Sequence, residues 1–499
     1  MSTTQIILGP PGTGKTTELL KILSKYLDSG GTPDKVGFIS YTKKSVNEAR
    51  DRVAKTFHID IKEFLYFRTI HSLAFLKLGM STVEVMQTAH YREIGNAVGI
   101  EITSKKSESD YSDLKKGDQM VMLEAMSRLK GISALSAYDS CIVDFSKEEF
   151  LFYVSALSDY KKSRMLYDFT DMLVLYSDKG PFPPLDLLLV DEAQDLCWLQ
   201  WQIVEKLRAV SKQTIIAGDD DQAIFSWSGA DVGYFINLCK KTPGRVLHQS
   251  YRVPKKINAL ASHLSYGLFD RVEKYFSPTK IEGAVYSAVD IEDIDMSSGE
   301  WLILIRNSFL EESVVSSLRM CGYFYESKRS IGNIYEELYA AQIWEKLKKN
   351  SITIKEALLV LSFIKNKKEE RPFKNMREKE LLTRPLFEGY TGIQVKENWY
   401  DALDKISVED REYIIASRRR GESLNKTPRI RVSTIHGAKG GEADNVVVYT
   451  DVAKKTYDAM QKNMDDELRV FYVAVTRARQ NLYLIQASTK YYFPVEDYL

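Results

Sequence analysis

The motif that most constrains the fold is the run Gly9-Pro10-Pro11-Gly12-Thr13-Gly14-Lys15-Thr16. It fits the pattern GxxxxGK[ST], and it stands between an apolar strand at Gln5–Leu8 and a helix-like run from Thr16 to Tyr26. Its glycines let backbone N–H groups turn inward around phosphate oxygens, and the helix that follows adds a favourable dipole. An ordinary Gly/Pro turn would lack this strand-and-helix context. The motif therefore predicts a nucleotide site.

The side chains of this motif have separate expected roles at a bound ATP. Lys15 would neutralise the β- and γ-phosphates, and Thr16 would hold Mg²⁺. The residues expected to surround the nucleotide are Gly9, Pro10, Pro11, Gly12, Thr13, Gly14, Lys15, Thr16 and Thr17.

Two adjacent carboxylates follow the apolar run 187–190, which has the composition of a buried central strand. Asp191 suits a metal-directed acid, and Glu192 suits a base that activates water. Taken alone, the pair could also be an acidic helix cap, although this is the weaker alternative. Beside a phosphate-binding loop, the catalytic interpretation is the stronger one, with Thr16 and Asp191 as the metal ligands.

Apolar runs alternate with helical runs around these motifs, which is typical of a parallel α/β sheet with sites at the strand C-terminal ends. A second α/β unit is expected from about Arg245. Two long helical and polar stretches, 74–160 and 334–423, interrupt the pattern and are interpreted as inserted subdomains. The further expected strands are Val36–Ser40, 187–190, Thr214–Gly218, Trp301–Ile305, 429–432 and 446–449.

The composition is that of a globular protein. The 499 residues carry 69 basic and 68 acidic side chains and are 44% hydrophobic, which excludes a mainly disordered chain. No apolar run approaches the ~20 residues of a membrane span and no signal peptide is present, so we expect a cytoplasmic protein without membrane contact. The net charge of +1 predicts that any nucleic acid is bound through local sites. The cysteines Cys141, Cys197, Cys239 and Cys321 are widely spaced, predicting buried thiols without disulfides or zinc.

An ordered series of further motifs resembles that of the UvrD/Rep/PcrA-type superfamily 1 helicases. Any one of these motifs could arise by chance, whereas the ordered set spans nearly the whole chain and is specific. The matching segments are Tyr41–Lys43 (motif Ia), Thr69–Leu73 (Ib), Asp168–Leu173 (DFDDLL), Asp191–Asp195 (DEAQD), Gly218–Ala230 (III), Gln249–Arg252 (IV), Thr434–Gly440 (V) and Val473–Arg479 (VI).

The resemblance implies two RecA-like cores with ATP in the cleft between them. Gln222 would sense the γ-phosphate and couple its state to the DNA. Arg252 and Arg477 would act as arginine fingers, a role that needs planar donors and a permanent charge. Tyr251 would stack on the adenine, and Glu442 would approach the ribose. The competing interpretations are surface ion pairs for the arginines and a buried core position for Tyr251.

Aromatic residues of the same motifs are candidates for contact with single-stranded bases. Phe225 and Trp227 would each stack on a base with ~1–3 kcal/mol, which suits movement independent of sequence, and Tyr41 is a third candidate. The residues that could bond phosphates or couple the DNA to ATP are Thr42, Thr69, His71, Thr434 and His436. For the two histidines, a core or loop-bracing role is an equal alternative.

The resemblance also divides the chain into four parts. Residues 1–75 and 161–244 would form core 1A, with 76–160 as its helical insertion 1B. Residues 245–333 and 424–499 would form core 2A, with 334–423 as a reduced helical insertion 2B.

Three features depart from the family pattern. The P-loop begins at Gly9, which leaves no room for the upstream Q motif that reads adenine, so other NTPs are expected as substrates. Ser226 and Ser228 stand where the family often has arginines, which lowers the expected salt dependence of DNA binding. The second insertion is short, and its basic runs 365–368 and Arg418–Arg420 are interpreted mainly as solvated helix faces.

The resemblance thus implies an ATP- and Mg²⁺-dependent translocase on single-stranded DNA that unwinds duplexes with 3′→5′ polarity. Its expected partners are single strands, junctions of single- and double-stranded DNA, and proteins of DNA replication or repair. One alternative is a translocase that strips proteins from DNA with little unwinding. Another is a nucleotide-dependent recruitment module, against which the complete set of hydrolytic residues argues.

Overall fold

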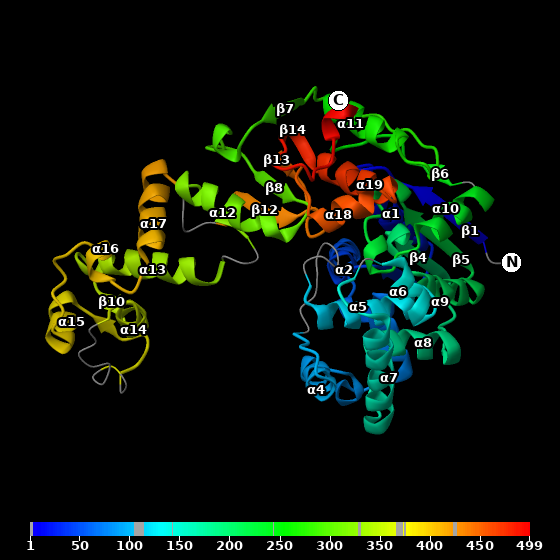
Figure 1. Ribbon diagram of the computed structural model, residues 1–499, viewed down its shortest axis with the longest axis horizontal. Coiled ribbons are helices and arrows are strands. Elements are labelled where there is room, and N and C mark those ends of the chain that lie inside the picture. The colour runs from blue at the N-terminus through cyan, green and yellow to red at the C-terminus, as the bar shows by residue number, and fades with distance from the viewer. Residues whose placement is uncertain are drawn as a thin grey trace. The chain divides into compact units, whose positions relative to one another are not determined.

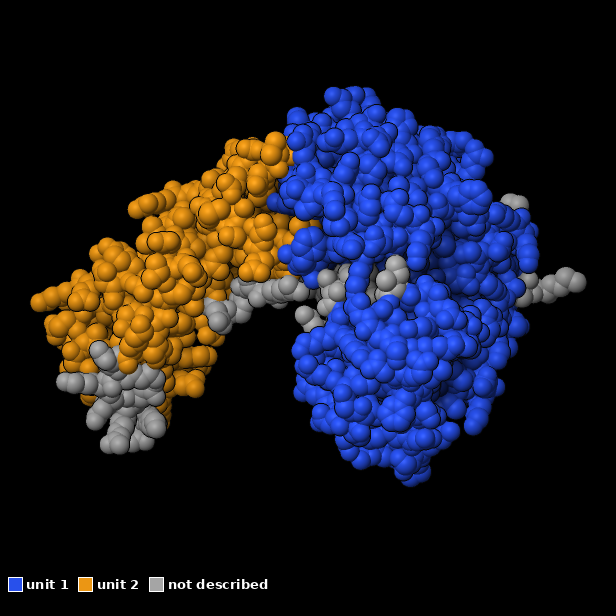
Figure 2. All heavy atoms as spheres, viewed as in Figure 1, with its two compact units in different colours: residues 1–287, 304–309, 434–499 blue, residues 288–303, 310–433 orange. Residues whose placement is uncertain are grey.

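The computed structural model describes residues 3–103, 114–141, 143–242, 244–327, 331–365, 373, 376–422 and 427–499. The chain forms two compact units, coloured separately in Figure 2. Unit 1 comprises residues 1–287, 304–309 and 434–499, and unit 2 comprises residues 288–303 and 310–433. Every motif that the sequence assigns to the nucleotide or to DNA therefore lies in unit 1.

The first sheet is six-stranded and parallel, with the order β3-β2-β4-β5-β1-β6. Because parallel strands end at one edge, the P-loop after β1, Asp191 at the end of β4 and the segment after β5 converge there. In register, Leu8 pairs with Gly218 and Ser40 with Asp191. The strands are β1 (Thr3–Leu8), β2 (Val36–Ser40), β3 (Tyr66–Arg68), β4 (Leu187–Asp191), β5 (Gln213–Gly218) and β6 (Arg245–Val246).

Strand alternation divides the apolar residues of this sheet between two faces. Ile6 packs in one cluster with Trp201, whereas its neighbour Ile7 packs in another with Leu19. Both faces are thus covered by helices, which explains the continuous apolar strands in the sequence. The covering helices are α1 (Lys15–Asp28), α2 (Lys43–Phe57), α3 (Ile70–Leu78), α8 (Phe169–Lys179), α9 (Trp198–Ala209) and α10 (Val232–Lys241) (Figure 1).

The stretch between α3 and α8 is helical, as the sequence predicts, and has a core of its own. Phe150 and Tyr153 of α7 pack there with Met120 and Leu123 of α5. Ser146 begins α7 through a capping box with Glu149, which satisfies two backbone N–H groups at the helix start. The helices are α4 (Thr88–Val98), α5 (Lys116–Leu129), α6 (Ala134–Ser140) and α7 (Lys147–Arg164).

The second sheet is also six-stranded, with the order β7-β14-β13-β8-β12-β9. The pairs β13/β14 and β12/β9 are parallel. Its strands are β7 (Ala284–Ala288), β8 (Trp301–Ile305), β9 (Tyr325–Glu326), β12 (Ile430–Thr434), β13 (Ala443–Tyr449) and β14 (Ala478–Ile485). Its helices are α11 (Lys255–Tyr266), α12 (Glu311–Met320), α18 (Lys454–Met460) and α19 (Met464–Val475). The predicted class of two parallel-sheet α/β cores with helical insertions is confirmed.

Several details differ from the sequence-based expectation, among them the strands β3, β9 and β14, which were not predicted. Arg245 and Val246 pair with Ile7 and Leu8, so they complete the first sheet, whereas the sequence places the start of the second unit here. The strand β7 was not predicted, because its residues are partly exposed and lack a continuous apolar run.

Unit 2 contains a separate core around Trp344, Phe387 and Leu347. It is helical as expected, with an additional antiparallel pair of short strands, β10 (Ile352–Thr353) and β11 (Leu381–Leu382). The helices are α13 (Ile331–Leu347), α14 (Ile354–Ser362), α15 (Arg384–Thr391), α16 (Trp399–Ala402) and α17 (Val408–Arg420).

The basic run at the end of α17 is partly occupied within unit 2. The Arg418 guanidinium lies 5.3 Å from the Trp399 ring centre, and that of Arg420 lies 3.9 Å from the Tyr323 ring centre. Arg420 Nε also donates to the Cys321 carbonyl at 2.7 Å. These contacts favour the structural interpretation over duplex binding. Of the other basic run, residues 366–368 lie outside the described residues.

Within the described ranges, no helix combines the length and the apolar character needed to cross a membrane. All four cysteines are free thiols. Cys197 and Cys239 are buried as predicted, whereas Cys141 and Cys321 are partly exposed.

Candidate active site and nucleic-acid interface

The P-loop follows β1 and folds around its own lysine. Lys15 Nζ donates to the Gly9 carbonyl at 3.0 Å, and a side chain at Gly9 would collide with the Lys15 stem. Gly12 has a φ of 72°, which favours glycine, and Gly14 caps α1 in the same left-handed region. Thr13 Oγ1 donates to the Pro10 carbonyl at 2.8 Å. The loop is thus preorganised as a compact turn at a helix N-terminus, as an anion site requires.

The two acidic residues after β4 face the P-loop. Thr16 Oγ1 donates to Asp191 Oδ2 at 2.8 Å, and Lys15 Nζ lies 3.7 Å from Glu192 Oε1. Burial and the neighbouring Glu192 charge raise the pKa of Asp191, whereas the charges of Lys15 and Lys439 outweigh burial and lower the pKa of Glu192. Glu192 is therefore ionised, and the Thr16–Asp191 pair offers a hydroxyl and a carboxylate side by side.

Two arginines from distant parts of the chain reach this site. Arg477 is buried; its Nη2 donates to Gln222 Oε1 at 3.0 Å and its Nε to the Val473 carbonyl at 2.9 Å. Arg252 is in an ion pair with Glu442, and a side chain at Gly12 would collide with Arg252. Burial and the positive charge of Arg252 lower the pKa of Arg477 to about 9. Two guanidinium groups brought together beside a P-loop are suited to an anion.

Motif IV is joined directly to the P-loop. Ser250 Oγ donates to the Pro11 carbonyl at 2.7 Å, and Tyr251 N donates to the Gly12 carbonyl at 2.9 Å. The Tyr251 side chain is 78% exposed, so the alternative of a buried core tyrosine is wrong. Its ring is available for stacking at the mouth of the site.

Sequence reasoning missed a buried ion pair that joins three motifs. Lys439 Nζ contacts both Asp195 carboxylate oxygens, at 2.7 and 2.5 Å, and donates to the Gln222 carbonyl at 2.7 Å. Burial raises the pKa of Asp195 to about 7, although Lys439 opposes this shift. Both residues lie in recognised motifs. Their pairing across 244 positions has no signal in a single sequence.

The candidate base-stacking residues form one aromatic cluster. Tyr41 stacks on Phe225 with ring centres 5.1 Å apart, and Phe225 and Trp227 rings lie 6.3 Å apart. The His436 ring lies edge-on to Trp227 at 5.9 Å, while its Nε2 contacts the Ile224 carbonyl at 3.0 Å. His436 is buried, so its role in bracing this loop is the supported one.

A hollow of about 380 Å³ adjoins this cluster. Trp227 and His436 line it together with four cationic side chains, Lys130, Arg306, Lys455 and Lys462, and two acidic ones, Asp466 and Glu467, of which Glu467 is paired with Arg306. An aromatic surface beside several positive charges is the combination that a single nucleic-acid strand requires.

The remaining candidates lie outside the cluster and serve local structure. Thr42 and Thr69 accept from Ser45 N and Ser72 N and thus cap α2 and α3. Thr434 is buried and accepts from Gly437 N at 3.0 Å. His71 is half-buried and lies edge-on to Phe169 at 6.1 Å.

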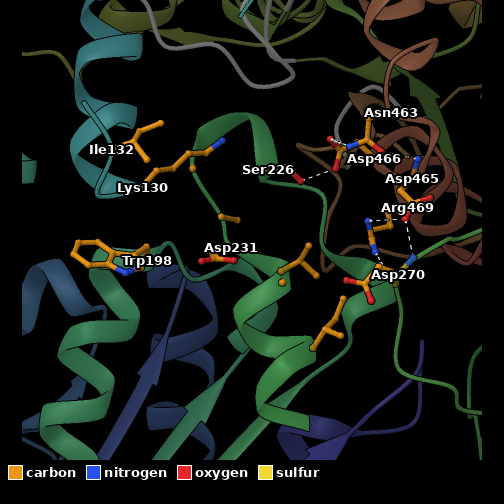
Figure 3. A pocket seen from close by; sticks show the side chains of 15 residues that line it. Lys130, Ile132, Trp198, Ser226, Asp231, Asp270, Asn463, Asp465, Asp466 and Arg469 are labelled. Atoms are coloured by element: carbon orange, nitrogen blue, oxygen red, sulfur yellow. Dashed lines mark hydrogen bonds and ion pairs between the residues drawn. The ribbon is translucent and has the colours of Figure 1, made fainter. Parts of the chain in front are cut away.

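The two serines of motif III also make internal contacts. Ser226 Oγ donates to Asp466 Oδ1 at 2.8 Å, as Figure 3 shows, and Ser228 Oγ donates to the Phe225 carbonyl at 2.9 Å. These hydroxyls therefore fasten the loop that carries the aromatic residues.

Comparison with protein families matches both halves of the chain. The UvrD/REP helicase N-terminal domain matches residues 1–243, and the UvrD-like helicase C-terminal domain matches residues 324–489. The chain belongs to the UvrD-type superfamily 1 DNA helicases. The two matched ranges include the P-loop, the DEAQD segment and motifs V and VI.

Individual relatives are distant in sequence. The ATP-dependent DNA helicase PcrA of Leuconostoc citreum is 23% identical over 346 residues, which cover 63% of this chain and 46% of that protein. This chain thus spans about half the length of that relative. A probable DNA helicase of Mycoplasma pneumoniae is 22% identical over 531 residues, covering 98% of this chain and 82% of that protein. The PcrA helicase of Staphylococcus epidermidis is 23% identical over 605 residues, with the same two coverages of 98% and 82%.

Proposed function

We propose that the chain is an ATP-dependent translocase on single-stranded DNA and a DNA helicase that moves 3′→5′ and separates strands. The observation that carries this proposal is the convergence of two sets of charges. Lys15 and Glu192 follow two strands of the first sheet, β1 and β4. Arg252 and Arg477 come from later parts of the chain, and all four side chains meet at the P-loop.

In this proposal the site acts through positioning and charge. Lys15 holds the β- and γ-phosphate oxygens, and Glu192, ionised beside Gln194 at 2.5 Å, orients and deprotonates the attacking water. Arg252 and Arg477 stabilise the charge that develops on the transferred phosphoryl group. Tyr251 stacks on the base, and Glu442 stays near the ribose once Arg252 turns toward phosphate.

Thr16 and Asp191 together fit a magnesium ion. A buried carboxylate with a raised pKa accepts a hydrogen bond from the Thr16 hydroxyl, and both groups are oxygen ligands of the kind Mg²⁺ prefers. Mg²⁺ bound there would neutralise phosphate charge. Thr16 and Asp191 are the side chains that would hold it.

A short path connects this site to the proposed DNA contacts. Gln222 bonds Arg477, and three residues later Phe225 stacks with Tyr41. In motif V, Lys439 bonds the Gln222 carbonyl and His436 contacts the Ile224 carbonyl. A movement of Gln222 would therefore be transmitted to the aromatic cluster through one rigid loop, which supports coupling between ATP and DNA.

The first test is ATP hydrolysis with and without single-stranded DNA. We expect a DNA oligonucleotide to raise kcat at least about tenfold, because DNA and the closed ATP site would favour the same conformation. Steady-state phosphate release measures this effect, with single-stranded RNA of equal length as the comparison. An unchanged rate would contradict the proposal and favour a recruitment module that uses hydrolysis as a timer.

The stacking contact gives a second test. We expect Trp227→Ala to weaken binding of single-stranded DNA by about 1–3 kcal/mol, because it removes one base-stacking face. Fluorescence anisotropy of a labelled oligonucleotide measures the affinity. Phe269→Ala is the matched control, since this aromatic side chain is 97% exposed and lies outside the cluster. Equal affinity of the Trp227 variant and the wild type would remove Trp227 from the proposed interface.

One observation favours the stripping translocase as a second candidate. The match to the Staphylococcus epidermidis protein extends over 605 positions, more than the 499 residues of this chain, so that relative contains segments absent here. A reduced insertion at 334–423 would provide less surface for duplex DNA. Unwinding of a tailed duplex and displacement of a protein from a coated single strand, measured in parallel, separate the two activities.

The domain division belongs to the same proposal. Residues 1–75 and 161–244 would be core 1A, and residues 245–333 and 424–499 core 2A, with 76–160 and 334–423 as insertions. Single-stranded DNA and its junctions with duplex DNA would be the substrates, in the cytoplasm, with replication or repair proteins as partners.

A further inference from the structure

Three consecutive carboxylates are buried immediately after β5. Asp219, Asp220 and Asp221 have side chains that are at most 1% exposed, and all three surround the ammonium group of Lys274. Lys274 Nζ lies 2.7 Å from Asp220 Oδ1, 2.9 Å from Asp221 Oδ2 and 3.1 Å from Asp219 Oδ1. Its own side chain is 1% exposed. Burial alone would lower the pKa of Lys274, yet the three carboxylates raise it, so that the ammonium stays charged.

The other cations nearby, Arg271 and Arg469, contact Asp221 and backbone carbonyls instead of Asp219. Arg271 forms a two-pronged bond to Asp221, at 3.0 and 2.7 Å. Asp220 also accepts from the Val272 N–H at 2.7 Å. Arg469 donates to backbone carbonyls, including that of Asp270 at 2.6 Å. Among the described residues, Lys274 is thus the cation paired with the Asp219 carboxylate.

Asp219 connects this lysine to the site of hydrolysis. While Oδ1 faces Lys274, Oδ2 accepts from Gln222 Nε2 at 2.6 Å. The amide of a glutamine has one donor end and one acceptor end. Because Asp219 takes the donor end, the acceptor Oε1 is directed at Arg477 Nη2, 3.0 Å away. The backbone N–H of Asp219 is itself held by Gln194 Oε1 at 2.9 Å.

We propose that Lys274 is a positioning residue for ATP hydrolysis: its ammonium group holds the Asp219 carboxylate in place, so that Asp219 orients the Gln222 amide and this amide places the Arg477 guanidinium. The inference rests on the proposed function, since it assigns Arg477 to the reaction. It adds to that function a residue from the segment between α11 and β7, outside all of the recognised motifs.

The physical consequence of losing Lys274 follows from the hydrogen-bond chemistry. A buried carboxylate that loses its cation also loses the attraction that fixes its position. Asp219 Oδ2 would then no longer hold Gln222 Nε2 in place, and Gln222 Oε1 would no longer be directed at Arg477 Nη2. Arg477 would thus lose the contact that directs it.

The test is a double-mutant cycle on ATP hydrolysis at saturating single-stranded DNA. We expect Lys274→Met to lower kcat about tenfold or more, with the KM for ATP changed less than about threefold. Lys274→Arg, which keeps the charge, should restore kcat to within about threefold of the wild type. In a Gln222→Ala background, Lys274→Met should lower kcat by less than about twofold, because both changes remove the same chain of contacts.

Two further variants separate positioning from general destabilisation. Lys161→Met is the matched control, because Lys161 bridges the buried Asp168 at 2.7 Å and the partly exposed Asp171 at 2.8 Å, away from the site. It should lower the melting temperature and leave kcat within about twofold. If Lys274→Met does not fold, Asp219→Asn takes its place, since it breaks the same ion pair from the acidic side while Lys274 keeps Asp220 and Asp221 as partners.

The outcomes are distinct. A loss of kcat that is absent in the Gln222→Ala background supports the inference. If the losses of kcat caused by Gln222→Ala and by Lys274→Met multiply in the double variant, the inference is overturned. The same holds if Lys274→Arg is as impaired as Lys274→Met. Both outcomes leave the proposed function intact. A wild-type chain that does not hydrolyse ATP would overturn the proposed function and the inference together.

Discussion

Replacing Lys15 by alanine is expected to lower kcat/KM for ATP hydrolysis by at least about 100-fold, equivalent to about 2.7 kcal/mol of transition-state stabilisation. The Lys15 ammonium group lies between the Gly9 carbonyl and Glu192, at the centre of the P-loop. Its removal takes away the positive charge facing the phosphates. It also leaves the partly buried Glu192 without its nearest cation, which favours protonation of the base.

The matched control for this variant is Lys21→Ala on the same helix. The Lys21 side chain is 68% exposed and its nearest acidic partner is Glu18, at 3.7 Å. This variant should hydrolyse ATP at the wild-type rate, because an exposed ion pair on a helix contributes little. Phosphate release with saturating DNA measures both variants. A Lys15→Ala protein that keeps DNA-stimulated hydrolysis would contradict the assignment of this site.

Arg477→Lys is expected to lower kcat by about 100-fold or more while the KM for ATP changes less than about threefold. The guanidinium now bonds Gln222 Oε1 and the Val473 carbonyl with two different nitrogens. A lysine has a single charged nitrogen and cannot hold both partners while it also contacts a phosphoryl oxygen. The loss should therefore appear in the chemical step.

Arg479→Lys provides the comparison within the same motif. Arg479 is about one-third exposed; its Nε contacts Asp444 Oδ1 at 3.1 Å and its Nη1 lies 3.7 Å from Glu442 Oε1, and neither contact involves Gln222 or Arg477. Its kcat should remain within about twofold of the wild type. Pre-steady-state measurement of a single turnover would separate chemistry from product release. If Arg477→Lys raised the KM for ATP and left kcat unchanged, a role for Arg477 in the transition state would be excluded.

Much of the fold could be predicted because the strands of a covered parallel sheet are apolar throughout. Leu187–Val190 and Trp301–Ile305 have this composition, and both are strands with all residues buried. The P-loop and the acidic pair were predictable for a related reason: phosphate and metal contacts need particular residue types at fixed short spacings. Arg245 and Val246 illustrate the limit, because the partner strand of so short a segment is not encoded locally.

By itself, the sequence determined which residues make up the proposed site, namely a P-loop motif, two carboxylates, two arginines and several aromatic residues. The tertiary structure alone decided how these groups are paired. Lys439 with Asp195, Arg477 with Gln222, and Lys274 with Asp219 are contacts between residues 55 to 255 positions apart. The physical reason is that a buried charge needs an opposite charge nearby, and folding can supply that charge from a distant part of the chain. The spacing of residues within a motif does not indicate which distant residue this is.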